Sequence, residues 1–343
     1  MTSISLLVIN YHSARLAVDA IRTARAASSG PLQTVVVDNS DDPVEVEALR
    51  GIADVVIAAP RNLGYAGGIN AGRRSCDGEV IVVSNPDVQF GEHAIDRLAD
   101  AGAAVAGPAL FWDEAYRWML PPADLQTRSE VIDRVFASRS RTWAGRRDRR
   151  RFAARVAFWS LDKPTRVRAL SGAVMAVRAG ALDAAGGFDE RFALYFEEND
   201  FLRRVRGDVV YVPAARCRHL YNQSAADSNE SGVLYAQSEV RYLRKWGGLF
   251  AKRFEKHRPD SMSQPSANSR IGESALPFGR DNVVIEASPL ASFETAAGYF
   301  GNDLVDVPDD IWSTYRGEVL YLRAVDRRSG RVLHSWAKAR IQA

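Results

Sequence analysis

Short apolar runs alternate with segments of helical periodicity along the first 110 residues, and this alternation limits the possible folds more than any other feature. Each run is almost continuously apolar, which is typical of strands buried on both faces. The order predicts an α/β fold with a mostly parallel sheet covered by helices. We expect strands over 4–9, 34–37, 54–57, 79–83 and 104–106, and helices over 12–25, 44–49, 66–75 and 94–99.

Composition narrows the class of protein. The chain has 343 residues, of which 46% are hydrophobic, enough for packed cores in about two domains. Its 45 basic residues against 42 acidic ones give a net charge of only +3, which argues against a dedicated nucleic-acid binder. Two cysteines exclude a disulfide framework and a Cys-rich zinc site, and they favour a reducing compartment.

No apolar run approaches the roughly 18 residues that span a bilayer. The first ten residues lack a basic stretch and a cleavage site, so they predict a strand and not a signal peptide. We therefore expect a cytoplasmic protein, either soluble or peripheral at the inner face of the plasma membrane.

Residues 126–168 interrupt the alternation with an arginine-rich stretch. Five arginines fall within 146–151, and Trp143 and Phe152 lie among them. One interpretation is a solvated basic helix or loop. The other is attraction to an anionic membrane or a phosphorylated lipid, at about 1 kcal/mol per basic residue near the surface.

The alternating pattern returns after the arginine-rich stretch and then changes character. We expect strands over 171–177 and 209–212 and helices over 179–185, 196–206 and 237–246. Residues 259–275, rich in Ser with two Pro, predict a linker. Strands over 283–286, 317–325 and 331–337, with a hairpin turn at 326–330, predict a small β-rich appendage.

A glycine-rich segment over 62–72 follows one expected strand and opens a helix. Glycines allow the backbone to approach a ligand, and a helix N-terminus favours phosphate. The alternative is a turn without a ligand. The spacing is not G-x-G-x-x-G, and the loop after the first strand has no glycine, which disfavours a dinucleotide-binding protein such as an NAD-dependent epimerase.

Two further features have the residue types of a metal site. Asp87 follows a strand, and a carboxylate there can hold Mg²⁺ or Mn²⁺ beside a diphosphate. His219 follows a later strand and would complete the same site. The alternatives are an aspartate that stabilises a turn and a structural histidine.

Three carboxylates crowd into four residues at Glu197, Glu198 and Asp200. Mutual repulsion raises at least one pKa towards the range useful for a general base. The alternative is a helix start whose acids favour the positive end of the helix dipole.

Taken together, these residues resemble family 2 glycosyltransferases, inverting enzymes of the GT-A fold, and within them the rhamnosyltransferase-like branch. The resemblance covers about residues 3–250, and its most specific part is the 62–72 loop. Asn85 stands where the D-x-D motif has its first carboxylate, and Glu198 stands where the family's Glu-Asp pair has aspartate. The similar segments are 6–11, 35–40, 62–72, 85–87, 171–178, 186–192, 195–200 with Arg204, 210–213 and His219.

The resemblance implies a role for each site residue. Glu198 would be the general base, tuned by Glu197 and Asp200, or Glu197 itself would be the base. Asp87 and His219 would hold Mn²⁺ or Mg²⁺. Acceptor-side residues would be Ser171, Gly172 and Arg204. The nucleotide-sugar would bind at Asn10, Asp38, Asn39, Asn62, Gly64, Gly67, Asn70 and Asn85.

The same resemblance predicts transfer of a sugar from a nucleotide-diphosphate donor to a hydroxyl of a glycan or lipid-linked acceptor in cell-surface polysaccharide synthesis. The expected donor is dTDP-rhamnose, with a UDP-sugar next. The expected divisions are a donor half over 1–120, the arginine-rich insertion over 121–168, an acceptor half over 169–258, the linker, and a β-rich domain over 276–343.

Two other classes of protein stay open. A sugar nucleotidyltransferase would also place a nucleotide and a metal on such a sheet, but its glycine-rich, lysine-containing signature near the N-terminus is absent. A non-catalytic sugar-nucleotide-binding protein would not need the intact acid cluster at 197–200.

Overall fold

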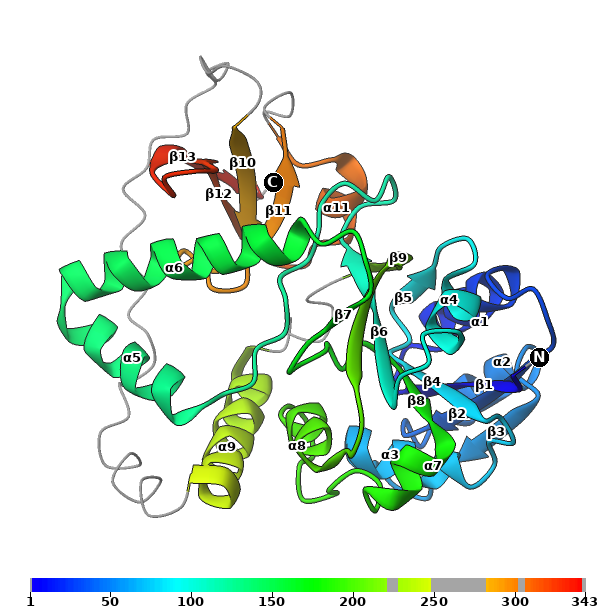
Figure 1. Ribbon diagram of the computed structural model, residues 1–343. Coiled ribbons are helices and arrows are strands. Elements are labelled where there is room, and N and C mark those ends of the chain that lie inside the picture. Colours follow the sequence, from blue (N-terminus) through cyan, green and yellow to red (C-terminus); the bar gives the residue numbers. More distant parts are fainter. Residues whose placement is uncertain (1, 221–227, 248–281, 302–305, 341–343) are drawn as a thin grey trace.

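The computed structural model describes residues 2–220, 228–247, 282–301 and 306–340. Within these ranges the chain forms a nine-stranded sheet covered by helices and a separate four-stranded sheet near the C-terminus (Figure 1). The expected α/β architecture with a β-rich appendage is therefore confirmed. The expected linker at 259–275 lies outside the described residues.

The large sheet has the order β3-β2-β1-β4-β8-β6-β9-β5, with β7 beside β9. Strands β3, β2, β1 and β4 are parallel, whereas β8 runs antiparallel to β4 and β6. Its strands are β1 (Ile4–Asn10), β2 (Leu32–Asp38), β3 (Val55–Ala58), β4 (Val80–Ser84), β5 (Val88–Phe90), β6 (Val105–Phe111), β7 (Thr165–Arg166), β8 (Val174–Arg178) and β9 (Val209–His219).

Helices cover both faces because the strands are apolar on both sides. Leu6 and Val8 of β1 pack into one apolar cluster with Ile21, while Leu7 and its neighbours pack into the other with Ile69. The helices are α1 (Ala14–Ala26), α2 (Pro43–Arg50), α3 (Gly64–Arg73), α4 (Ala94–Ala99), α5 (Arg128–Arg139), α6 (Arg141–Trp159), α7 (Ala179–Ala184), α8 (Glu197–Arg204), α9 (Ser228–Gly247) and α11 (Asp309–Thr314).

The C-terminal sheet has the order β11-β10-β12-β13, all antiparallel. The expected hairpin is present, because Gly330 and Arg331 each hydrogen-bond to Asp326 across the turn. The strands are β10 (Val283–Ser288), β11 (Ala297–Phe300), β12 (Val319–Asp326) and β13 (Val332–Ala339).

The C-terminal sheet packs on the rest of the chain through aromatic side chains. Trp118 stacks on Tyr299 with ring centroids 5.6 Å apart, and both belong to one buried apolar cluster. Met119 and Gly298 exchange two backbone hydrogen bonds. A Cβ atom at Gly298 would lie 2.2 Å from the ring of Trp159, so only glycine lets β11 approach α6 this closely.

The arginine-rich stretch folds as α5 and α6, and α6 lies along the C-terminal sheet (Figure 1). Five of the ten arginines on these two helices form ion pairs with acids among the described residues. Arg155, 4% exposed, contacts Glu286 of β10 at 2.6 Å, and Glu286 also contacts Arg323 of β12 at 2.7 Å. Arg323 in turn pairs with Asp148 of α6 at 2.9 Å. This buried charge network fixes the sheet against α6.

Candidate active site

Polar side chains meet where β1 and β2 end side by side. Asn10 donates from Nδ2 to Asp38 Oδ1 at 2.7 Å and to Glu45 Oε2 at 2.9 Å. Ser40 donates to Asp38 Oδ1 at 2.8 Å. The Oδ1 atom of Asn10 is buried without a hydrogen-bond partner among the described residues. Its capacity to accept a hydrogen bond is therefore not used by the described residues.

The glycine-rich loop is held by two asparagines. Asn62 Oδ1 accepts a hydrogen bond from Gly64 N at 2.8 Å, and Asn39 Nδ2 donates to Gly64 O at 3.1 Å. Gly64 has φ +71°, and a Cβ there would lie 2.7 Å from Ala193 O. The loop thus needs glycine at this position, and it touches the segment that precedes the acid cluster.

Asn70 and Gly67 lie further along α3. Asn70 donates to Phe188 O and Glu190 Oε1 at 2.9 and 2.8 Å and accepts from Phe188 N at 2.8 Å. Both polar atoms of Asn70 are therefore engaged in holding α3 to the turn at 186–190. A Cβ atom at Gly67 would lie 3.0 Å from the Cβ of Leu63, so a larger residue at this position would crowd Leu63.

The two expected metal ligands are adjacent. Strand β5 pairs with β9 so that Val88 faces His219, which brings His219 Nε2 to 3.3 Å from Asp87 Oδ1. Burial raises the pKa of Asp87, but the charge and hydrogen bond of His219 outweigh it and leave the pKa below its ordinary value. Asn85 is fixed nearby through its backbone N–H to Ala173 O at 2.8 Å.

The donor set fits a divalent cation that takes further oxygens from its substrate. One carboxylate oxygen and one imidazole nitrogen lie 3.3 Å apart, and Mg²⁺-type sites use one or two carboxylates plus substrate phosphates. The described residues contain no cluster of three or more His, Cys, Asp or Glu side chains with metal-ligand geometry. Protein ligands alone would therefore not fill the coordination sphere.

The acid cluster is positioned by an unusual backbone. Tyr195 and Phe196, directly before α8, have φ values of +69° and +68°, a conformation that costs about 1–3 kcal/mol per non-glycine residue. This turn starts α8 at Glu197, which is 5% exposed. Burial and then the charge of Glu198 raise the pKa of Glu197 well above its usual value, and burial raises the pKa of Glu198.

Tyr65 lies among the candidate catalytic groups. Its hydroxyl donates to Gly172 O at 2.9 Å, and Gly172 packs against Glu198, whose Cβ and Cγ would lie 3.4 Å from a Cβ at that position. Burial, followed by the charges of Glu197, Glu198 and Asp87, raises the pKa of Tyr65. The charges of all three carboxylates therefore affect the pKa of the same hydroxyl group. Sequence analysis did not single out Tyr65, although it lies inside the 62–72 motif.

Asp200 and Arg204 make their contacts with α9 and with the turn at 186–190. Asp200 is fully buried and accepts from Arg204 Nε and Trp246 Nε1, both at 2.9 Å, while Lys245 Nζ lies 2.7 Å away. Arg204 also donates to Gly187 O at 2.8 Å. These contacts join α8 to α9 and to the preceding turn. Ser171 caps the start of β8, accepting from Ala173 N at 3.3 Å.

A cavity of about 220 Å³, called here the inner pocket, opens beside Glu198. Its walls come from α5, α6, α8, α9 and the loop between β10 and β11, segments far apart in the sequence. It is lined by Asp124, Leu125, Gln126, Glu130, Arg134, Arg147, Arg151, Tyr195, Phe196, Glu198, Asn199, Tyr235, Glu294 and Thr295.

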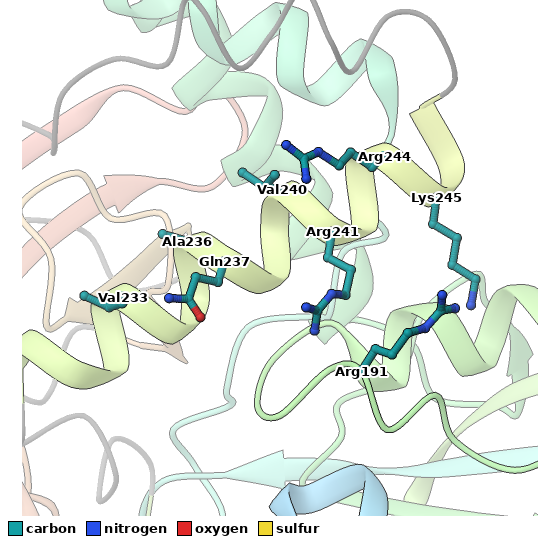
Figure 2. A pocket seen from close by; sticks show the side chains of 8 residues that line it. All are labelled: Arg191, Val233, Ala236, Gln237, Val240, Arg241, Arg244 and Lys245. Atoms are coloured by element: carbon teal, nitrogen blue, oxygen red, sulfur yellow. The ribbon is translucent and has the colours of Figure 1, made fainter.

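A larger cavity of about 740 Å³, called here the basic hollow, follows another face of α9 (Figure 2). Its described lining includes no acidic side chain. Arg241 and Arg244 are exposed, whereas Arg191 and Lys245 both pair with Asp189. The lining consists of Arg191, Val233, Ala236, Gln237, Val240, Arg241, Arg244 and Lys245.

The α/β sheet agrees with the fold that the sequence resemblance to glycosyltransferases implies. Residues 2–237 match the family described as glycosyltransferase-like family 2, and the chain belongs to that family. A relative from Mycobacterium tuberculosis (strain CDC 1551 / Oshkosh), N-acetylglucosaminyl-diphospho-decaprenol L-rhamnosyltransferase, is 28% identical over 219 residues, or 56% of this chain and 68% of the relative. The H37Rv strain has the same match.

Solved structures also resemble the chain. GalNAc-T7 with UDP, GalNAc and Mn²⁺ is 15% identical with a TM-score of 0.48, and the match covers 74% of this chain and 50% of that one. The mannosyltransferase PcManGT from Pyrobaculum calidifontis with GDP-Man and Mn²⁺ is 15% identical with a TM-score of 0.46, covering 71% and 64%. This chain therefore spans half to two thirds of these structures.

No helix within the described residues has the length and apolar character needed to cross a bilayer. Cys76 and Cys217 are both buried and free.

Proposed function

We propose that this protein is an inverting glycosyltransferase that moves a sugar from a nucleotide-diphosphate donor to an acceptor hydroxyl. Family membership supports the reaction class. The single observation that carries the mechanism is the position of Glu198, a carboxylate with a raised pKa that lines the inner pocket and packs against Gly172, whose carbonyl oxygen accepts from the Tyr65 hydroxyl.

Glu198 acts as the general base. Its carboxylate takes the proton from the acceptor hydroxyl while that oxygen forms a bond to the anomeric carbon. The bond from the anomeric carbon to the diphosphate oxygen breaks at the same time, so the configuration inverts and the nucleoside diphosphate leaves. A positioned base contributes about 10²–10⁴-fold. Glu197 does not line the inner pocket, and burial and then the charge of Glu198 raise the pKa of Glu197.

The donor base and ribose lie at the ends of β1 and β2, where Asn10 offers an unpaired Oδ1 atom beside Asp38. The loop held by Asn39 and Asn62 borders the sugar diphosphate. We propose dTDP-rhamnose as the donor, because the relative from M. tuberculosis is named as a rhamnosyltransferase, with a UDP-sugar as the next choice.

Asp87 and His219 would hold Mn²⁺ or Mg²⁺, with Asn85 nearby. A bound cation there would supply Lewis-acid stabilisation of the negative charge on the leaving diphosphate. Their nitrogen and oxygen donors are within 3.3 Å of each other, which suits a site completed by substrate oxygens.

The acceptor is a glycan carried on a lipid diphosphate, and the reaction belongs to cell-surface polysaccharide synthesis at the cytoplasmic face of the membrane. The named relative acts on such a lipid. In this chain the basic hollow suits a phosphate-bearing lipid, because Arg241 is exposed beside apolar Val233 and the described lining includes no acidic side chain. Co-sedimentation with phosphatidylglycerol vesicles should fall in R241E/R244E and not in the remote control R331E.

The direct test of the reaction compares Glu198→Gln with Glu92→Gln, an exposed and remote control. Each variant is incubated with a panel of nucleotide-sugars and a diphosphate-lipid acceptor, and product is measured with donor binding by calorimetry. We expect Glu198→Gln to lose transfer and keep donor affinity. Full turnover in Glu198→Gln removes that residue as the base, and donor binding without any product in the unaltered chain indicates a non-catalytic binding protein.

A further inference from the structure

The inner pocket has a wall that the family match does not include. Glu294 and Thr295, in the loop between β10 and β11, line it together with Glu198, while the family match ends at residue 237. We propose that this loop is an acceptor-specificity element, so that the C-terminal sheet helps to select the sugar that presents its hydroxyl to Glu198. The inference rests on the proposed transfer reaction and adds the source of its acceptor selectivity.

Unsatisfied polar atoms around the pocket point to a ligand. Gln126 Oε1, Asn199 Oδ1 and Arg151 Nε are buried without a hydrogen-bond partner within the described parts of the chain. All three residues line the inner pocket. An unpaired buried polar group costs about 1–3 kcal/mol, so two acceptors and one donor at one cavity indicate a ligand with several hydroxyl groups.

The charge of the pocket favours a neutral sugar over an anion. Arg134, Arg147 and Arg151 are opposed by four lining carboxylates, those of Asp124, Glu130, Glu198 and Glu294. The rings of Tyr195, Phe196 and Tyr235 add apolar faces for sugar C–H groups. At about 220 Å³ the cavity lies below the roughly 300–1,000 Å³ typical of drug-sized ligands, which suits one sugar ring.

The loop is held rigidly enough to discriminate between sugars. Glu294 pairs through its carboxylate with Arg147, and its carbonyl oxygen accepts from Arg151 Nη2 at 3.5 Å. Arg147 also contacts Asp133 of α5 at 3.1 Å. The sheet behind the loop is fixed to α6 by the charge network around Glu286 and by the close contact of Gly298 with Trp159. A site positioned by such packed elements keeps its geometry.

Two conservative variants test the proposal. Thr295→Val keeps the shape and removes the hydroxyl, and Glu294→Gln removes the charge. Ser335→Ala, exposed on β13 of the same sheet, is the matched control. The readouts are the acceptor KM for transfer, the donor KM, slow hydrolysis of the donor, and saturation-transfer NMR with methyl glycosides of glucose, galactose and N-acetylglucosamine as probes.

We expect each pocket variant to raise the acceptor KM by about tenfold, the size of one lost hydrogen bond, and to weaken the NMR signal of the preferred glycoside. Donor KM and donor hydrolysis should stay within twofold of the unaltered chain. An unchanged acceptor KM, an equal loss of donor hydrolysis, or no glycoside signal in the unaltered chain overturns the proposal. If the unaltered chain binds a glycoside and the variants weaken that binding, the pocket proposal is supported. If the same chain shows no transfer, the proposed reaction is rejected instead.

Discussion

The substitution Glu286→Gln tests whether charge fixes the C-terminal sheet in place. Glu286 is fully buried, with Oε1 2.8 Å from Arg155 Nε and Oε2 2.7 Å from Arg323 Nε. Glutamine keeps the shape but leaves two buried guanidinium groups without their shared anion. Among the described residues Arg323 keeps an ion pair with Asp148, and Arg155 has no second ion pair.

The expected cost follows from the burial. Removing one partner of a buried ion pair destabilises a protein by about 3–5 kcal/mol. Domains of 150–250 residues lose about 2–4 °C of Tm per kcal/mol, so Glu286→Gln should lower Tm by roughly 6 °C or more. Differential scanning calorimetry and urea unfolding followed by Trp fluorescence measure this loss.

An apolar replacement of the network is the matched control. A triple variant, R155M/E286L/R323M, removes the charges together and should unfold near the temperature of the unaltered chain or above it. The reasoning is refuted if Glu286→Gln unfolds at the original temperature. It is also refuted if the triple variant is as unstable as the single one, because packing and not uncompensated charge would then explain the loss.

Four further predictions concern the candidate active site. Because burial raises the pKa of Glu198, transfer should fall as pH drops through a value above the ordinary glutamate pKa, measured as kcat/KM against pH; an acid limb at the ordinary value contradicts this assignment. The same shift means that the fold loses stability as pH rises from the ordinary to the raised pKa, so Glu198→Gln should have a higher Tm at pH 7 than the unaltered chain. Gly64→Ala should cost at least about 1–2 kcal/mol and raise the donor KM, since φ is +71° and Ala193 O lies 2.7 Å from the new Cβ; unchanged urea unfolding would show that the loop relaxes freely. Asp87→Ala should abolish the Mn²⁺-dependent part of donor affinity in calorimetry, and equal affinity with and without its carboxylate removes Asp87 from the site.

Local patterns were enough to predict the sheet. The buried strands β1, β2 and β4 are continuous apolar runs, and the final hairpin has a turn of Asp, Ser and Gly. The antiparallel direction of β8 was not predictable from those patterns, because direction depends on how the chain returns to the sheet. The three-residue β5 is too short to show a periodicity.

The candidate site was only partly predictable, for a different reason. Motif spacing indicated Asp87, His219 and Glu198, whereas the inner pocket depends on contacts between distant segments. Arg147 and Glu294 are 147 residues apart, and sequence gives no sign that they pair. The membrane interpretation of the arginine-rich stretch assumed solvated charges, but Arg155 of that stretch is buried against an acid from the C-terminal sheet.

Helix α9 stands between the two cavities. It presents Tyr235 to the inner pocket and Val233 and Gln237 to the basic hollow. A helix with its side chains is about 10–12 Å across. If the phosphate of an acceptor binds in the basic hollow while its hydroxyl reaches Glu198, the width of α9 sets the distance that the acceptor must span. Molecules whose reactive oxygen lies too close to their anionic end would then be rejected by length alone, whatever their stereochemistry.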